Sequence, residues 1–148
     1  MEAPERIAKH LELIQGVINR LGANSFLLKG WSMTVLVGGS LLMVRLRSDQ
    51  PLLAMTLLAP VFGFWLLNAY FLLQERLFRD EYNRVRRLGD TQYEMNTEQH
   101  KGKTNRTWPK TFLSVTLTAF YLIEIAFVSI LSAALHLMGA SAKPSCLY

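Results

Sequence analysis

LLAMTLLAPVFGFWLLNAYFLL, residues 52–73, is a run of 22 consecutive residues that carry no charge. About 20 apolar residues are enough for a helix to cross the hydrocarbon core of a bilayer. Pro60 and Gly63 are expected to bend this helix, since Pro60 removes a backbone hydrogen bond one turn earlier. We therefore predict a transmembrane helix over residues 52–73.

Two further segments are apolar enough to cross a membrane. Residues 112–138 supply 27 residues, which is enough for a tilted span. Residues 26–44 have a shorter uncharged part, but Lys29 and Arg45 can extend their charged ends toward opposite membrane interfaces. Residues 45–51 leave room only for a tight turn, so the first two spans form a helical hairpin. We therefore expect an all-α membrane protein with three transmembrane helices.

The N-terminal residues 1–24 have the pattern of an amphipathic helix outside the bilayer. Gly22 is a suitable end for this helix, and its charged start shows no cleavable signal peptide. One face is apolar, and its residues recur three or four positions apart: Ile7, Leu11, Ile14, Ile18 and Leu21. This apolar face could pair with other copies of the chain, lie on the bilayer surface, or pack on the helix that follows the second span. The same five residues are our candidates for oligomerisation.

The segment between the second and third spans, residues 74–110, is polar and is expected in the cytoplasm. Helical spacing continues without a breaker up to Arg87, which predicts that the second span extends as one long helix into water. From Gly89 onward we predict a loop, with the Trp-Pro pair at 108–109 as a turn signal. With a short polar tail at 139–148, the whole chain is expected to be a single membrane domain.

The distribution of positive charge predicts the orientation. The chain has sixteen Lys and Arg residues and a net charge of +5, and thirteen of the sixteen lie in the N-terminal region or in the second connecting segment. The positive-inside rule places both regions in the cytoplasm and the C-terminus on the other side. Nine basic residues of the second segment are accompanied by six acidic ones, which favours a solvated helix face over a nucleic-acid surface. The best candidates for binding an anionic ligand there are Arg84, Arg86 and Arg87.

The sequence carries no pattern typical of an enzyme or a metal site. The single cysteine, Cys146, excludes a disulfide framework and a Cys-based zinc or iron–sulfur site. The three histidines lie far apart in sequence: His10, His100 and His136. There is no Ser–His–Asp grouping, no Gly-rich phosphate loop and no HExxH motif. We therefore expect no catalytic activity, no cofactor and no bound metal.

Glu124 lies near the middle of the third span, where an ionised carboxylate that faces lipid costs several kcal/mol. On a helical projection it lies beside a polar face about 80° wide, which comprises Ser114, Thr118, Tyr121, Ser129, Ser132 and His136. One interpretation is a cation pore lined by Glu124, Thr118, Tyr121, Ser129 and Ser132. The other is helix packing, in which a neutral Glu124 bonds to Asn68 or to a nearby hydroxyl.

Three spans cannot enclose an ion path by themselves, so a pore requires several copies of the chain. The first functional hypothesis is therefore a homo-oligomeric, regulated ion channel that conducts cations. The alternative is a non-conducting scaffold or regulatory subunit that recruits a cytoplasmic partner, because roughly 60 of the 148 residues are expected in the cytoplasm.

Several stretches of the first 110 residues resemble a family of small bacterial membrane proteins. They are HLELIQ at 10–15, NSFLLKGW at 24–31, NAYF at 68–71 and QERLFR at 74–79, followed by Tyr82, Val85 and Arg86. Together with its size and layout, these motifs make the chain resemble the membrane effectors of bacterial anti-phage defence, such as the channel subunit of the Hailong system.

This resemblance implies a homo-oligomeric channel in the bacterial inner membrane, held shut by an oligonucleotide that a partner nucleotidyltransferase makes. Glu124 would then serve cation passage, and a basic cytoplasmic site would hold the ligand. No ligand-binding residue is carried over, because no family motif fixes one. The expected partners are other copies of the chain, the lipid bilayer, and a nucleotidyltransferase or its nucleotide product.

Overall fold

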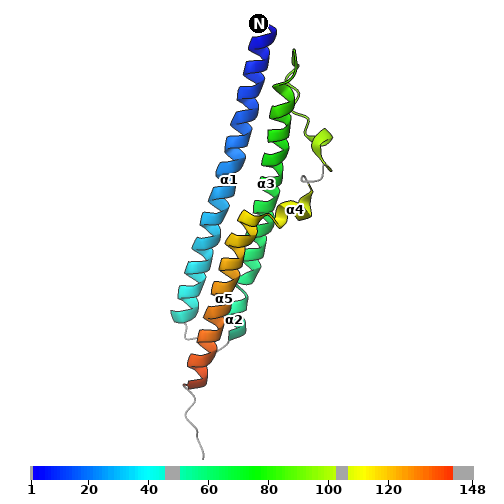
Figure 1. Ribbon diagram of the computed structural model, residues 1–148. Coiled ribbons are helices and arrows are strands. Elements are labelled where there is room, and N and C mark those ends of the chain that lie inside the picture. Colours follow the sequence, from blue (N-terminus) through cyan, green and yellow to red (C-terminus); the bar gives the residue numbers. More distant parts are fainter. Residues whose placement is uncertain (1, 46–50, 103–106, 142–148) are drawn as a thin grey trace, which may run out of the picture. The chain divides into compact units, whose positions relative to one another are not determined.

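A computed structural model describes residues 2–45, 51–102 and 107–141 (Figure 1). Within these ranges the chain forms helices and no strand. Three helical segments are long and apolar enough to cross a membrane: Ala3–Arg45, Leu53–Val85 and Val115–Leu137. The prediction of an all-α protein with three candidate membrane spans is therefore confirmed. The predicted turn at 46–50, the end of the tail at 142–148 and Cys146 lie outside the described residues.

Helix α1, Ala3–Arg45, runs without interruption through the point where we predicted a break (Figure 1). The expected end of an N-terminal helix at Gly22 is therefore wrong. A glycine inside a helix costs only about 1 kcal/mol relative to alanine, and packing can offset that cost. A Cβ atom on Gly22 would lie 4.0 Å from an Oε atom of Glu75, so the position lies against the following long helix, α3.

Two residues, Thr56 and Leu57, separate helix α3, Leu58–Val85, from a short helix, α2, Pro51–Met55. The interruption lies one turn before Pro60, as expected, because Pro60 has no N–H to donate to the carbonyl of Thr56. That carbonyl accepts a hydrogen bond from the N–H of Ala59 instead (3.2 Å). At its other end α3 continues past Leu73 into the polar sequence and ends at Val85.

The segment after α3 is more structured than the predicted loop. It contains a 3₁₀ turn, η1 (Glu98–His100), and a short helix, α4 (Trp108–Phe112), in which Pro109 occupies the first turn and does not end a helix. The third long helix, α5, is Val115–Ser141 and does not begin at Phe112 as predicted. Residues 113–114 separate α4 from α5. Here the N–H of Ser114 bonds to the carbonyl of Thr111, three residues earlier, in a tight turn.

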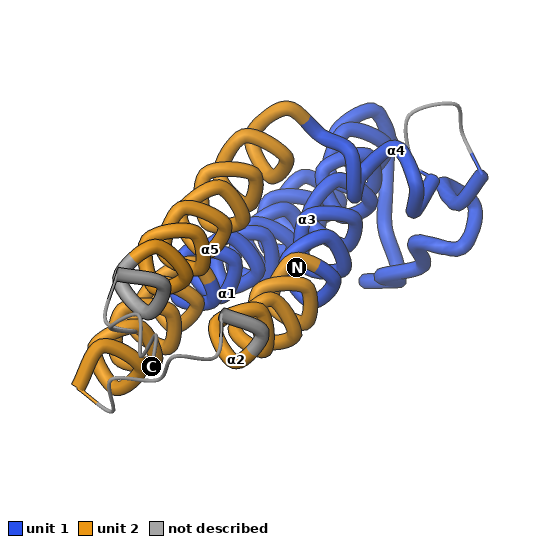
Figure 2. Tube along the Cα trace, turned by 90° about the horizontal axis from the view of Figure 1, so that it is seen from below, with its two compact units in different colours: residues 1–28, 66–114 blue, residues 29–65, 115–148 orange. Residues whose placement is uncertain are grey.

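The chain divides into two compact units (Figure 2). Unit 1 comprises residues 1–28 and 66–114, and its core is formed by Ile14, Ile18 and Val85. Partly buried apolar side chains pack against this core: Ile7, Leu11, Phe78 and Tyr82. The N-terminal apolar face therefore packs on the extension of the second span, which is the third of the alternatives left open by the sequence; Leu21 is half-buried.

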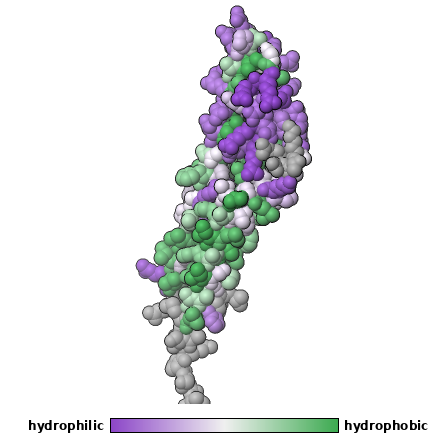
Figure 3. Space-filling view, viewed as in Figure 1, coloured by the Kyte–Doolittle hydropathy of each residue, from purple (hydrophilic) through white to green (hydrophobic). Residues whose placement is uncertain are grey.

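Unit 2 comprises residues 29–65 and 115–148 and has an apolar exterior. Within it α2 packs against α5. Large apolar side chains face outward on each of its helical segments, among them Trp31, Leu41, Phe62, Ile123, Phe127 and Ile130. Figure 3 shows hydrophobic residues covering most of the visible surface of this unit. An exposed apolar surface of this extent is typical of a segment surrounded by lipid.

The packing of unit 2 requires a small residue at Gly39. A Cβ atom there would lie 2.5 Å from Cδ2 of the buried Leu57, whereas a Cβ atom on the neighbouring Gly38 would have nothing within 4 Å. We predict that Gly39→Val lowers the free energy of unfolding in detergent by about 1–3 kcal/mol, because the added methyl groups overpack the contact with Leu57. Gly38→Val is the matched control and should change stability far less. Equal losses in the two variants, measured by circular dichroism during heating, would contradict this packing.

Candidate functional site

Glu124 is buried inside unit 2, with 1% of its surface exposed. It belongs to the buried face of α5, whose members recur three or four residues apart: Leu117, Tyr121, Glu124, Val128, Ser132 and Leu135. The carboxylate is thus covered by residues of its own chain. A carboxylic acid in an apolar interior requires hydrogen-bond partners, because a buried polar group without one loses the hydration it had in water.

One oxygen of Glu124 has such a partner. The hydroxyl of Ser32 on α1, which is 2% exposed, donates a hydrogen bond to Oε2 of Glu124 (2.7 Å). The other oxygen, Oε1, is buried and has no hydrogen-bond partner among the residues described. The structure therefore has the intrachain hydrogen bond to a hydroxyl that the packing interpretation predicts, and the donor comes from the first span.

Asn68, the other partner considered for Glu124, is fully buried in unit 1. There it accepts a hydrogen bond from the hydroxyl of Ser25. Within unit 2 an aromatic stack lies one turn from the carboxylate: the rings of Tyr121 and Trp65 are 5.6 Å apart and nearly parallel. The Glu124 site is thus flanked by close-packed aromatic side chains of the same unit.

The remaining residues of the predicted polar face do not share one environment. Tyr121 and Ser132 are buried with Glu124, whereas Ser129 is exposed and its hydroxyl bonds to the carbonyl of Ile125 (2.9 Å). Thr118 is half-buried, and His136 is exposed. The buried face of α5 includes Glu124 and the apolar residues Leu117 and Val128. The predicted polar face only partly overlaps with this buried face, so some of its residues are exposed. These positions in a single chain do not test whether the residues line a pore, so that role stays a prediction.

A second buried carboxylate, Glu81, organises unit 1. Its side chain is 0% exposed and lies on α3 beyond the uncharged residues 52–73. Arg84 donates to both of its oxygens, and the side-chain amide of Gln99 donates to Oε2 (3.1 Å). Nε2 of the buried His100 lies 2.8 Å from the same oxygen. Glu81 therefore attaches the η1 turn to α3.

The protonation of Glu81 depends on two opposing effects. Burial alone would raise the pKa of Glu81, but the hydrogen bonds from Arg84 and His100 outweigh burial and hold this pKa below its usual value of 4.5. The same contact with Glu81 raises the pKa of Arg84. Arg84 is thus a structural partner of Glu81 and carries little uncompensated charge.

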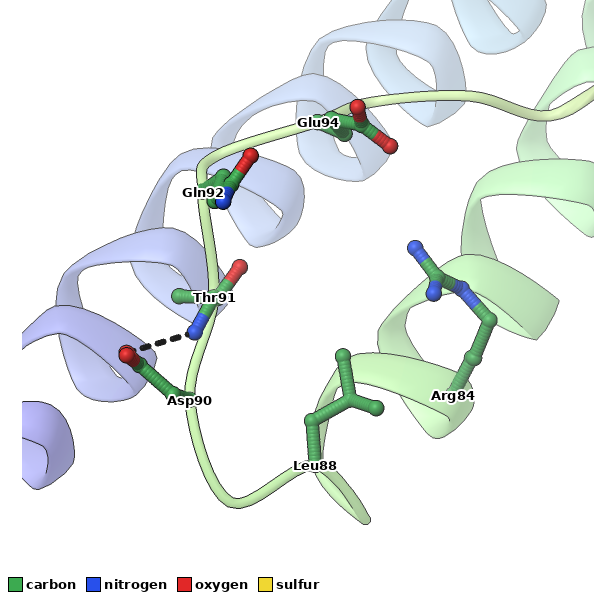
Figure 4. Close-up of a pocket in the computed structure, with 6 residues that line it drawn as sticks. All are labelled: Arg84, Leu88, Asp90, Thr91, Gln92 and Glu94. Atoms are coloured by element: carbon green, nitrogen blue, oxygen red, sulfur yellow. Dashed lines mark hydrogen bonds between the residues drawn. The ribbon is translucent and has the colours of Figure 1, made fainter.

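A pocket of about 280 Å³ lies beside Arg84 (Figure 4). Figure 4 shows Arg84 on one wall and the segment carrying Thr91, Gln92 and Glu94 on the other; Leu88 and Asp90 complete the lining. The lining holds one guanidinium and two carboxylates, so its charge does not favour an anion. Arg86 and Arg87 are exposed and do not line this pocket. The structure thus separates the three basic candidates.

Sequence reasoning missed the buried polar contacts that join distant parts of the chain. Ser32 lies in an apolar helix, and no spacing links it to Glu124, 92 residues later. His10 is fully buried, and its Nδ1 lies 2.7 Å from the hydroxyl of Thr91, which attaches the connecting segment to α1. The available signal was that Ser32 and Glu124 each occur among apolar residues, where a buried polar group needs a partner.

No protein-family model, curated protein or solved structure matches this chain. Among the described residues, no group of three or more His, Cys, Asp or Glu side chains is arranged to hold a metal ion.

Glu81 gives a testable dependence of stability on pH. Because its pKa is lowered by folding, its ionised form stabilises the protein above pH 4.5, and this contribution disappears as the pH falls through the lower value in the folded state. We predict that Glu81→Gln lowers the stability by about 2–3 kcal/mol at pH 7, from the loss of charged hydrogen bonds.

The difference between the wild type and Glu81→Gln should shrink as the pH falls below 4.5, since the protonated acid resembles the amide. Thermal unfolding in detergent at a series of pH values measures this difference. Glu94→Gln, an exposed change on the segment that follows α3, is the control. A difference that stays constant down to pH 3 would contradict the role assigned to the Glu81 charge.

Proposed function

We propose that the chain is the subunit of a homo-oligomeric, regulated cation channel. The observation that carries this proposal is a carboxylic acid with an unpaired oxygen, buried in a unit whose exterior is apolar. Ionisable residues within membrane segments are costly, and they characteristically belong to ion pathways or proton relays. The ionised form of Glu124 would attract cations and repel anions.

The oligomer follows from the size of the chain. Three spans are too few to surround a water-filled path, so such a path runs between copies. The apolar exterior of unit 2 offers contacts to both lipid and neighbouring copies. The N-terminal apolar face is less suited to this purpose, because Ile14 and Ile18 are already buried against Val85 of the same chain.

Regulation is supported by the position of the carboxylate. In the described arrangement Glu124 is held inside its own unit and not presented to a neighbour, which corresponds to a closed state. Opening therefore requires a trigger. The resemblance to anti-phage membrane effectors suggests a nucleotide or oligonucleotide made by a nucleotidyltransferase, acting in the cytoplasm of a bacterium. Arg86 and Arg87 are exposed on unit 1 and suit such an anion better than Arg84 does.

A second candidate function is a membrane scaffold that recruits a cytoplasmic partner. The observation in its favour is unit 1, where the connecting segment is fastened by buried polar contacts at both Glu81 and His10. A fastened segment presents a constant surface to a partner. In this case Glu124 would serve only to pack α1 against α5, and the protein would conduct nothing.

Cation flux into liposomes that contain the purified protein tests the channel. We predict flux for the wild type in the presence of its trigger, and a loss of rate or of cation preference in Glu124→Gln, which keeps the shape of the side chain and removes its charge. Glu98→Gln changes an exposed glutamate outside the apolar segments and is the control. Unchanged rate and selectivity in Glu124→Gln would remove Glu124 from the path. Absence of flux from every folded protein, with and without nucleotides, would favour the scaffold.

A further inference from the structure

Ser32 differs from other hydroxyl residues in the same half of α1. Thr34 and Ser40 donate their hydroxyls to carbonyls of their own helix, four residues earlier, at 2.9 and 2.6 Å. This is the usual arrangement for such residues in an apolar helix, because it needs no second element. Ser32 instead donates to Glu124 on α5, although it is as deeply buried as Ser40. Its hydrogen bond therefore joins two spans.

Both Ser32 and Glu124 can replace this hydrogen bond with another at little cost in free energy. If α1 and α5 separate, the hydroxyl of Ser32 can bond to its own helix as Ser40 does. Glu124 has one oxygen without a partner among the described residues, so the closed arrangement leaves it incompletely satisfied. Water that reaches the carboxylate can satisfy both oxygens. The contact thus has two arrangements that differ little in hydrogen bonding, as a switch requires.

We propose that Ser32 is the positioning residue that keeps Glu124 withdrawn in the closed channel. While the Ser32–Glu124 hydrogen bond is made, the carboxylate points into its own unit and takes no part in a path between copies. When the bond breaks, α5 is free to present the carboxylate to water and to passing cations. This inference rests on the proposed channel function and adds the contact that regulates it.

Small residues along the same face of α1 are compatible with such a movement. Ser25, Ser32 and Ser40 are buried at intervals of seven and eight residues, and Gly39 lies against Leu57. Small and hydroxyl residues let transmembrane helices approach closely without interlocking side chains. A helix with such a face can shift against its neighbour when one specific hydrogen bond is lost.

The test compares Ser32→Ala with Ser40→Ala in the full-length protein. Both changes remove one buried hydroxyl from α1, but the hydroxyl of Ser40 bonds to its own helix. We expect Ser32→Ala to raise cation flux without trigger about five- to tenfold, the factor that corresponds to the loss of one hydrogen bond. Ser40→Ala should leave this flux unchanged. Ser32→Thr retains a hydroxyl and should restore low basal flux, which separates loss of the bond from damage to the fold.

A second readout does not depend on conduction. The rate at which a membrane-soluble carbodiimide modifies Glu124, followed by mass spectrometry, reports how accessible the carboxyl group is. We expect faster modification in Ser32→Ala than in Ser40→Ala. If basal flux and modification are both unchanged in Ser32→Ala, the proposal is wrong. Faster modification with unchanged flux overturns the gate, because Ser32 then only positions the carboxylate.

The same experiment separates this inference from the channel itself. If the wild type conducts with its trigger but Ser32→Ala behaves like Ser40→Ala, the proposed channel function is supported and the proposed role of Ser32 is wrong. If neither the wild type nor any variant conducts under any condition, both the channel function and the role of Ser32 as a gate are wrong. In that case the modification rates still show whether Ser32 holds Glu124 in the scaffold.

Discussion

A carboxylic acid in the middle of an apolar helix constrains everything around it. Glu124 cannot face lipid at an acceptable cost, so α5 must turn this side chain inward, and a neighbouring helix must supply a hydrogen-bond donor. Ser32 meets this need from α1. The pairing fixes which face of each helix is buried in unit 2. It also explains why the outward faces of the same helices can be almost wholly apolar.

Unit 1 also contains a buried carboxylate, but its hydrogen-bond partners are different. Glu81 is as deeply buried as Glu124, but it is surrounded by charged and amide donors from α3 and from the η1 turn. Its ionised form is therefore favoured, whereas Glu124 has one hydroxyl donor and forms no ion pair with any residue that the structure describes. One carboxylate is stabilised as a structural anion, and the other is left incompletely satisfied. Only the second has the properties expected of a group that changes its environment during function.

The three candidate membrane spans could be predicted because the signal is the mean hydropathy of about 20 residues, which a single polar residue changes little. The packing of the N-terminal apolar face was one of three open alternatives, since periodicity shows a buried face without naming its partner. The continuity of α1 through Gly22 was missed because a weak local preference is easily overridden by packing. The Ser32–Glu124 and Glu81–His100 contacts were missed for another reason. Each joins positions whose proximity depends on the tertiary fold, and no local pattern encodes it.

The Ser32 hydroxyl and the Glu124 carboxylate belong to one chain, and their hydrogen bond joins α1 to α5. The most direct test replaces both residues with cysteine in a protein that also carries Cys146→Ser, and treats membranes with a short reagent that bridges two thiols. We expect a bridge within one chain, so the protein should keep the mobility of a monomer on a denaturing gel and should yield a linked peptide containing positions 32 and 124. Bridging between chains, which would give dimers on the gel, would show that Glu124 faces a neighbouring copy and would contradict the account.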